Sequence, residues 1–139
     1  MRLKAMAKIN LGLDVLGKRE DGYHEVRMIM QTIRMYDILD IRKTRRPGIV
    51  LTTNLPFIPT DQRNLVYKDV EEGLSIKLRK FIPVAAGMAG GSSDAAAAFV
   101  GVNRMFHLGL TEEQLMEHAV KVGADVPYCI MRGTALAEG

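Results

Sequence analysis

The chain has 139 residues, of which 47% are hydrophobic and 25% are charged, and its formal net charge is +3. This length and apolar content suffice for one domain with its own hydrophobic core. A single cysteine, Cys129, excludes an intrachain disulfide and a cysteine metal cluster, and no apolar run approaches the length of a transmembrane helix.

The first residues carry charges that interrupt any apolar segment, so they do not form a signal peptide. Together with the lone cysteine, this predicts a cytoplasmic protein without membrane contact. The one basic cluster, Arg42–Arg46, precedes Pro47 and Gly48 and has no interleaved aromatic residues. That pattern favours a solvated turn over a nucleic-acid surface.

Strands predominate in the first half of the predicted structure. Residues 3–16 alternate between apolar and polar, which predicts a strand with one buried face. Lys8 and Asn10 then both project from the other face of that strand, opposite the buried one. A turn is predicted at residues 17–22. Further strands are predicted at residues 25–36, 37–43, 49–53 and 74–79, with a loop at residues 54–64.

Helices predominate in the second half. One helix is expected from about Ser93 to Met105, and a second begins at Thr111 with the pattern of a capping box. Gly123 is expected to end the second helix; a rigid turn at residues 124–127 and a last strand at residues 130–136 follow. Strands first, and then a loop, two helices and a strand, predict an α+β layer fold rather than an alternating parallel sheet.

The glycine-rich segment before the first helix is the most informative stretch. Gly87, Gly90 and Gly91 precede two serines, Asp94 and four alanines. Such a loop at a helix start offers free backbone N–H groups and a partial positive charge to an anion, most often a phosphate. It has neither the lysine of a Walker A loop nor the spacing of a Rossmann loop. From this pattern alone, a phosphate site and a plain helix entry with a serine cap both stay open.

Other polar residues have an ordinary structural interpretation when each is taken alone. Lys8 is then a solvated charge on a strand face, Asp125 a turn cap, and Asp94 a charge at a helix start. Cys129 has apolar neighbours and no nearby histidine, so we expect a core residue rather than a nucleophile. No spacing of histidine and carboxylate residues indicates a metal site made by the protein.

Three motifs nevertheless occur in one chain: AKINL at residues 7–11, the glycine segment at 83–94, and GADVP at 123–127. This combination resembles the GHMP small-molecule kinases, and the glycine segment is similar to that family's phosphate loop. Together with GYH at residues 22–24, the outer motifs are most similar to members that act on a cytidine-diphosphate derivative in isoprenoid biosynthesis. The resemblance covers nearly the whole chain. It implies the family's two-layer α+β fold, a mixed sheet packed on helices, which also occurs in ribosomal proteins.

The resemblance implies transfer of the γ-phosphate of ATP to a substrate hydroxyl, with Mg²⁺ accompanying ATP. The family's catalytic lysine and aspartate match Lys8 and Asp125. An aspartate beside a lysine is a weak base, but it can orient the hydroxyl while the lysine offsets negative charge. Substrate-binding positions of the family match Asn10, Tyr23 and His24.

The resemblance also implies the nucleotide-binding residues. They are Asn64 on the adenine side and, in the phosphate loop, Pro83, Val84, Ala85, Ala86, Gly87, Met88, Ala89, Gly90, Gly91, Ser92 and Ser93.

Kinases of this family are longer and carry a second domain after this point. We therefore expect residues 1–139 to be an N-terminal ATP-binding domain in an apparently truncated kinase, with the family's C-terminal domain absent from this chain. Loss of packed segments would expose apolar surface, and the nine methionines would then promote homo-oligomers.

Three alternative functions stay open at this point. The first is a nucleotide-binding fragment without turnover. The second is a GHMP kinase for homoserine, mevalonate or a sugar, and Tyr23 and His24 argue against it. A nucleic-acid binder is the third alternative; only the basic cluster at residues 42–46 favours it, so we expect no nucleic-acid partner.

Overall fold

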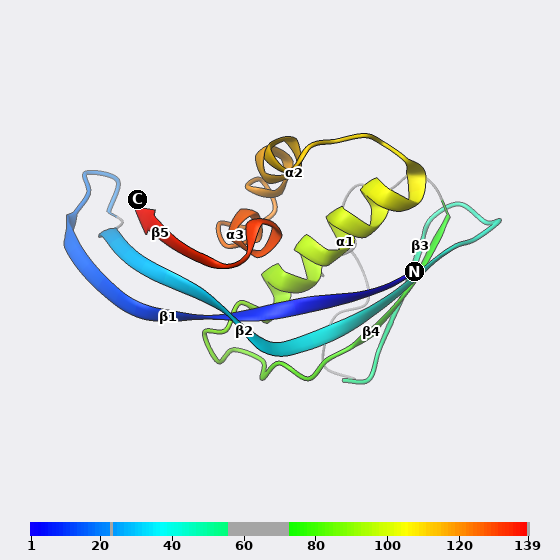
Figure 1. Cartoon of the computed structure of the whole chain (residues 1–139), viewed down its shortest axis with the longest axis horizontal. Helices are drawn as coiled ribbons and strands as arrows, with labels where there is room; N and C mark the ends of the chain where they lie inside the picture. Colours follow the sequence, from blue (N-terminus) through cyan, green and yellow to red (C-terminus); the bar gives the residue numbers. More distant parts are fainter. Residues whose placement is uncertain (23, 56–72, 139) are drawn as a thin grey trace.

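One sheet and three helices form two layers, with the helices on one side of the sheet (Figure 1). The computed structural model describes residues 1–22, 24–55 and 73–138. The strands are β1 (Arg2–Lys18), β2 (His24–Lys43), β3 (Ile49–Thr53), β4 (Leu74–Arg79) and β5 (Thr134–Glu138). The helices are α1 (Gly90–Phe106), α2 (Glu112–Ala119) and α3 (Val126–Met131). The predicted α+β layer fold is confirmed.

The sheet is mixed, as predicted. Its order is β1-β2-β4-β3, and β5 pairs with β2 outside this path. Only β3 and β4 run parallel to each other; the other pairs are antiparallel. The long hairpin of β1 and β2 extends beyond the helices and bends at its tip toward the side on which they lie, and β5 lies along that bent part (Figure 1). The bent part, which we call the arm, comprises residues 11–18, 24–31 and 134–138.

Strand β1 departs from the alternation expected for residues 3–16. The register with β2 shifts between Met6 and Lys8, so that Ala5, Ala7 and Lys8 are all buried. Such a bulge re-aims the side chains that follow it. Within the arm, β1 has no buried apolar face. The prediction of one buried face along the whole strand is therefore wrong for this part. The exposed apolar residues of the arm are Leu11, Leu13, Val15, Leu16, Ile29 and Leu136.

Strand β2 is continuous where two strands were predicted. The expected break between residues 36 and 37 falls at Asp37, whose carboxylate is completely buried instead of ending the strand. The alternation beyond it is as predicted, because Leu39 and Ile41 are buried and Arg42 is exposed. Strands at residues 49–53 and 74–79 are confirmed. Of the loop predicted at residues 54–64, all but the first two residues lie outside the described part.

The hydrophobic core has two parts that share α1. One lies between α1 and the strands β2, β3 and β4, and the other lies between α1, α2 and α3. Gly101 brings α1 close to the sheet, because a Cβ added there would lie 2.6 Å from Cδ1 of Ile41. The helix that carries the glycine segment is therefore held rigidly against the sheet.

The last third of the chain differs from prediction. The capping box at Thr111 is confirmed, since its hydroxyl accepts from the Gln114 amide at 3.3 Å and its own amide donates to the Gln114 side chain at 3.0 Å. The helix it starts ends at Ala119, not at Gly123. Helix α3 occupies the place of the predicted rigid turn and of the first part of the last strand, because Pro127 stands in its first turn, where proline favours a helix.

Candidate active site

The glycine segment forms an exposed loop that ends in an uncapped helix. Helix α1 begins at Gly90, three residues before the predicted start, and its N-cap Ala89 makes no side-chain cap hydrogen bond. Ala85, Gly87 and Ala89 have φ values of 60°, 71° and 54°. Successive residues of this kind turn backbone N–H groups toward one concave side. With no acidic residue in the first turn of α1, the loop and helix start present free donors to an anion.

Ser93 does not cap the helix. Its hydroxyl donates to the carbonyl of Met6 at 2.5 Å, so it joins α1 to strand β1. The loop also touches β1 directly, because the amide of Lys8 donates to the carbonyl of Met88 at 3.2 Å. The interpretation of this segment as a plain helix entry with a serine cap is therefore wrong in its cap.

Lys8 lies beside the loop and is buried, contrary to the solvated strand-face charge expected of it alone. Its side chain is 5% exposed, and its ammonium lies 3.6 Å from the carboxylate of Asp125, whose side chain is 41% exposed. The ammonium also donates to Oδ1 of Asn10 at 3.0 Å, so these two residues share a face as predicted. Residues from positions 8, 10 and 125 thus meet next to the glycine loop.

Asp125 reaches this place because it is the N-cap residue of α3. The buried Val126 and Tyr128 fix that helix in the core. Its carboxylate makes no cap hydrogen bond to the helix, which leaves its oxygens for Lys8 and for a ligand. A carboxylate next to a buried ammonium, half open to solvent, can hold a hydroxyl and receive its proton.

Two other predicted site residues, Tyr23 and Asn64, lie outside the described residues. His24 begins β2 and is exposed in the arm. Met30, the partner of Asn10 across the hairpin, is six residues further along β2, which corresponds to roughly 20 Å of strand. The structure therefore does not gather His24 with Lys8 and Asp125; it lies at the other end of the arm.

A second buried lysine, which sequence reasoning missed, lies behind the loop. Lys80 donates to Asp37 at 2.5 Å and to Asp94 at 2.7 Å, and all three side chains are at most 4% exposed. Asp94 lies in the second turn of α1 and is buried against Lys80, so it is not the helix-start charge expected of it alone. The signal for this cluster was Asp37, a carboxylate between Tyr36 and Ile38 within β2.

Burial and the neighbouring charges shift the pKa values of Asp94 and Lys80. Burial raises the pKa of Asp94 to about 8, although the attraction of Lys80 opposes this. Burial alone would lower the pKa of Lys80, but the two carboxylates outweigh it and raise that pKa. Asp37 accepts three hydrogen bonds, whereas Oδ1 of Asp94 has none. Burial therefore favours the protonated form of Asp94 near neutral pH.

Cys129 is a buried core residue, as predicted. Burial raises the pKa of its thiol to about 12, so it is not a nucleophile at neutral pH. Among residues 1–22, 24–55 and 73–138, no group of three His, Cys, Asp or Glu side chains could hold a metal ion. None of the helices in these ranges is both long and apolar enough to cross a membrane.

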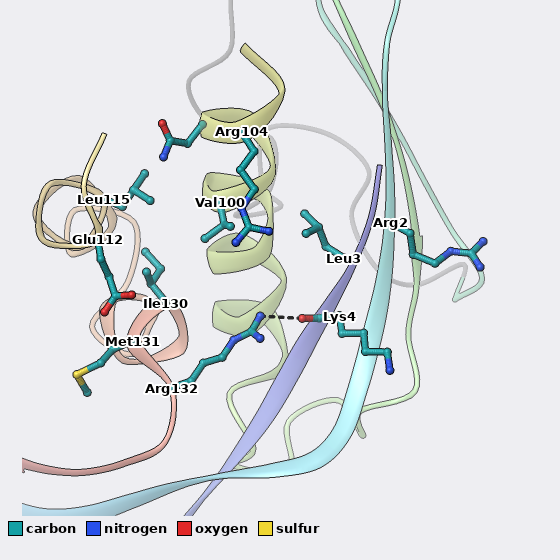
Figure 2. Close-up of a pocket in the computed structure, with 11 residues that line it drawn as sticks. Arg2, Leu3, Lys4, Val100, Arg104, Glu112, Leu115, Ile130, Met131 and Arg132 are labelled. Carbon is teal, nitrogen blue, oxygen red and sulfur yellow. Dashed lines mark hydrogen bonds between the residues drawn. The ribbon is translucent and has the colours of Figure 1, made fainter. Parts of the chain in front are cut away.

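A cavity of about 610 Å³ lies at the opposite end of α1 from the glycine loop. It is bounded by Leu3, Val100 and Leu115, and Arg104 and Arg132 extend into it (Figure 2). Arg132 donates to the carbonyl of Lys4 at 3.0 Å across its edge. None of the predicted site residues that the structure describes lines this cavity, so the candidate site is the open loop region and not the cavity.

Comparison with known proteins agrees with the fold. The family model described as "GHMP kinases N terminal domain" matches residues 61–133, more than half of the chain. The chain belongs to the GHMP kinase family.

Particular relatives within the family share one name. Sequences named 4-diphosphocytidyl-2-C-methyl-D-erythritol kinase from Lachnospira eligens and Lachnoclostridium phytofermentans are 55% and 58% identical to 100% and 99% of this chain. A crystal structure of 4-(cytidine 5'-diphospho)-2C-methyl-D-erythritol kinase superposes with a TM-score of 0.83 at 32% identity, over 100% of this chain and 52% of that one. The chain spans about half the length of these relatives, 51% and 50% of the two bacterial sequences.

More distant structures show the same fold. A mevalonate kinase from Methanococcus jannaschii matches with a TM-score of 0.71 at 16% identity, over 99% of this chain and 53% of that one. At such identity the likeness concerns the fold alone.

Proposed function

We propose that this chain is the N-terminal ATP-binding domain of a kinase that phosphorylates a hydroxyl of 4-diphosphocytidyl-2-C-methyl-D-erythritol in non-mevalonate isoprenoid biosynthesis. One observation carries the proposal. Lys8 and Asp125, which are 117 positions apart in the sequence, come within 3.6 Å beside a loop built to receive an anion. The names of the relatives supply the substrate.

The loop residues 83–93 would hold the phosphates of ATP. Three residues of positive φ and the uncapped start of α1 offer several N–H donors at once, and the helix dipole adds a favourable potential. Mg²⁺ prefers substrate phosphates, water and one or two carboxylates to an all-protein cage, and Asp125 is a half-exposed carboxylate beside the loop. When bound, Mg²⁺ would neutralise charge on the phosphates.

Lys8 and Asp125 would act on the accepting hydroxyl. Asp125 is open enough to accept a hydrogen bond from it, orient it toward the γ-phosphate and take its proton as the new bond forms. Lys8 holds that carboxylate in place, and its buried charge lowers the energy of negative charge developing nearby. Asn10 fixes the ammonium from the other side.

The arm would hold the rest of the substrate. A cytidine-diphosphate derivative is elongated, and the hairpin carries Asn10 near the candidate catalytic pair and His24 far from it. Contacts at both ends could therefore bind one molecule along the arm, with its base near Tyr23 and His24. The cytoplasmic location and the absence of a nucleic-acid or membrane partner stay predictions.

The test separates binding from transfer. We expect the wild-type chain to bind ATP in calorimetry and to release ADP when the substrate and Mg²⁺ are present. Asp125→Asn should lower turnover by about 10²- to 10⁴-fold and change the Kd for ATP less than about threefold, because general base catalysis has that magnitude. Glu117→Gln makes the same chemical change on the exposed face of α2 and should leave both unchanged.

Other outcomes assign a different role. Undiminished turnover in Asp125→Asn would exclude Asp125 as the base. Wild-type ATP binding without turnover would indicate a non-catalytic nucleotide-binding fragment, an outcome consistent with the half-length match to the relatives. Absence of ATP binding would refute the proposal.

A further inference from the structure

The buried cluster of Lys80, Asp37 and Asp94 joins the two ends of the glycine loop. Lys80 follows directly after β4, so it marks the start of the connection to α1. Asp94 lies in α1, fourteen residues later, and Asp37 lies in β2. The cluster therefore connects the strand before the loop, the helix after it and a neighbouring strand of the sheet.

Side-chain hydrogen bonds hold four backbone groups at the entry to the loop. Oδ1 of Asp37 accepts from the amides of Phe81 and Ile82, at 2.5 Å and 2.8 Å. The side chain of Asn54 binds the amide of Lys80 at 2.7 Å and its carbonyl at 3.1 Å. Residues 80–82 consequently have one fixed path over the sheet.

The exit from the loop is held by Lys80 itself. Its ammonium donates to Asp94 at 2.7 Å, and a Cβ on Gly90 would lie only 3.2 Å from it. The ammonium therefore rests against the first residue of α1 and binds the second turn. Between these fixed ends, residues 83–87 are exposed.

We propose that Lys80 is a positioning residue for the phosphate loop, which it holds in its anion-binding shape by tying Asp37 at the loop entry to Asp94 at the helix start. The inference rests on the proposed function in one respect, namely that the anion is the triphosphate of ATP. The side chain of Lys80 is 4% exposed and its ammonium is bound to Asp37 and Asp94, so it acts only through the loop.

The effect of this tie is entropic. A loop of seven residues between free ends loses conformational freedom when it closes around an anion, which weakens binding. With both ends fixed during folding, most of that loss precedes binding. Loosening the tie should therefore raise the Kd for nucleotide without lowering the fraction of folded protein.

The test uses a double variant, Lys80→Met with Asp37→Asn, beside the single variant Lys80→Met. The single variant leaves the buried Asp37 carboxylate without its counter-charge and can fail to fold, whereas removing both partners of a buried ion pair commonly preserves stability, and the amide oxygen of asparagine can still accept from Phe81 and Ile82. Glu117→Gln with Lys121→Met makes matched exchanges at exposed positions and serves as the control. The probes are ATP in calorimetry and hydrogen exchange of the backbone amides at residues 84–93 without nucleotide.

We expect the double variant to keep a cooperative thermal transition, to exchange the loop amides at least about tenfold faster and to bind ATP at least about tenfold more weakly, a change of about 1.4 kcal/mol. Unchanged exchange and unchanged ATP affinity in the folded double variant would overturn the proposal. If wild-type protein binds no ATP, the proposed function fails, while the exchange rates still decide whether Lys80 orders the loop.

Discussion

Two lysines flank the glycine loop, and their surroundings differ in one decisive respect. Lys8 and Lys80 are both almost completely buried. The carboxylate nearest Lys8 lies 3.6 Å away and is half open to solvent, whereas Lys80 has two buried carboxylates within 2.7 Å. An ion pair with unused, accessible acceptor capacity can serve a ligand. A closed pair has none to offer, and its use lies in holding other parts of the chain.

The largest expected effect is the difference in stability between variants of these two lysines. Lys80→Met should lower the free energy of unfolding by about 3–5 kcal/mol, because it leaves the buried Asp37 carboxylate without a counter-charge and removes the hydrogen bond to Asp94. Lys8→Met should cost less than about 1 kcal/mol, since Asp125 can be solvated when its partner is removed. Urea unfolding of both variants measures the difference. Equal losses in the two variants would show that the open and closed sites are not distinct.

The second expectation concerns pH and the closed site. Because the pKa of Asp94 is about 8 in the folded protein and near 4 when unfolded, the folded state holds an extra proton between these values. Stability should therefore fall as pH rises, by on the order of 1 kcal/mol per pH unit, and level off above about pH 8.

The matched variant for this expectation is Asp94→Asn, which cannot titrate and should remove most of that slope. Unfolding curves from about pH 6 to about pH 9 give both profiles. A wild-type profile without slope in this range would mean that Asp94 is ionised throughout.

The smallest expected effect is the difference in stability between alanine variants of two neighbouring glycines at the start of α1. Gly90→Ala should lower the free energy of unfolding by about 1 kcal/mol, because the new Cβ would press on the ammonium of Lys80, which its carboxylates hold in place. A Cβ added at Gly91 would meet no atom within 4 Å, so Gly91→Ala should leave stability nearly unchanged. Thermal unfolding of the pair gives the comparison, and a Gly90→Ala variant as stable as Gly91→Ala would contradict a closed cluster.

The sequence predicted the strands with clear alternation, the capping box and the α+β class, because these depend on local spacing. Helix α3 was mistaken for a turn and the start of a strand, since Pro127 stops a helix within its interior but favours one at its start. The bulge at Met6 to Lys8 has no local signature and arises from packing against the loop.

For the site, motif resemblance brought together Lys8, Asn10 and Asp125, and their proximity is seen in the structure. Lys80 was not found, since its partners Asp37 and Asp94 come from β2 and α1, and no spacing along the chain connects them. Asp37 could have been suspected, because a carboxylate flanked by Tyr36 and Ile38 within a strand is either a strand end or a buried partner of a cation. The roles of Asn10, Tyr23, His24 and Asn64 stay predictions.

Cys129 has a practical consequence. As the sole thiol of the chain, buried in the helix that Asp125 caps, it can be labelled only when that helix opens. The rate at which a thiol reagent modifies the native protein therefore reports how often α3 leaves the core, without any engineered probe. A ligand that binds between Asp125 and the loop would slow that reaction, because α3 would open less often. The labelling rate of Cys129 would therefore report whether the site is occupied.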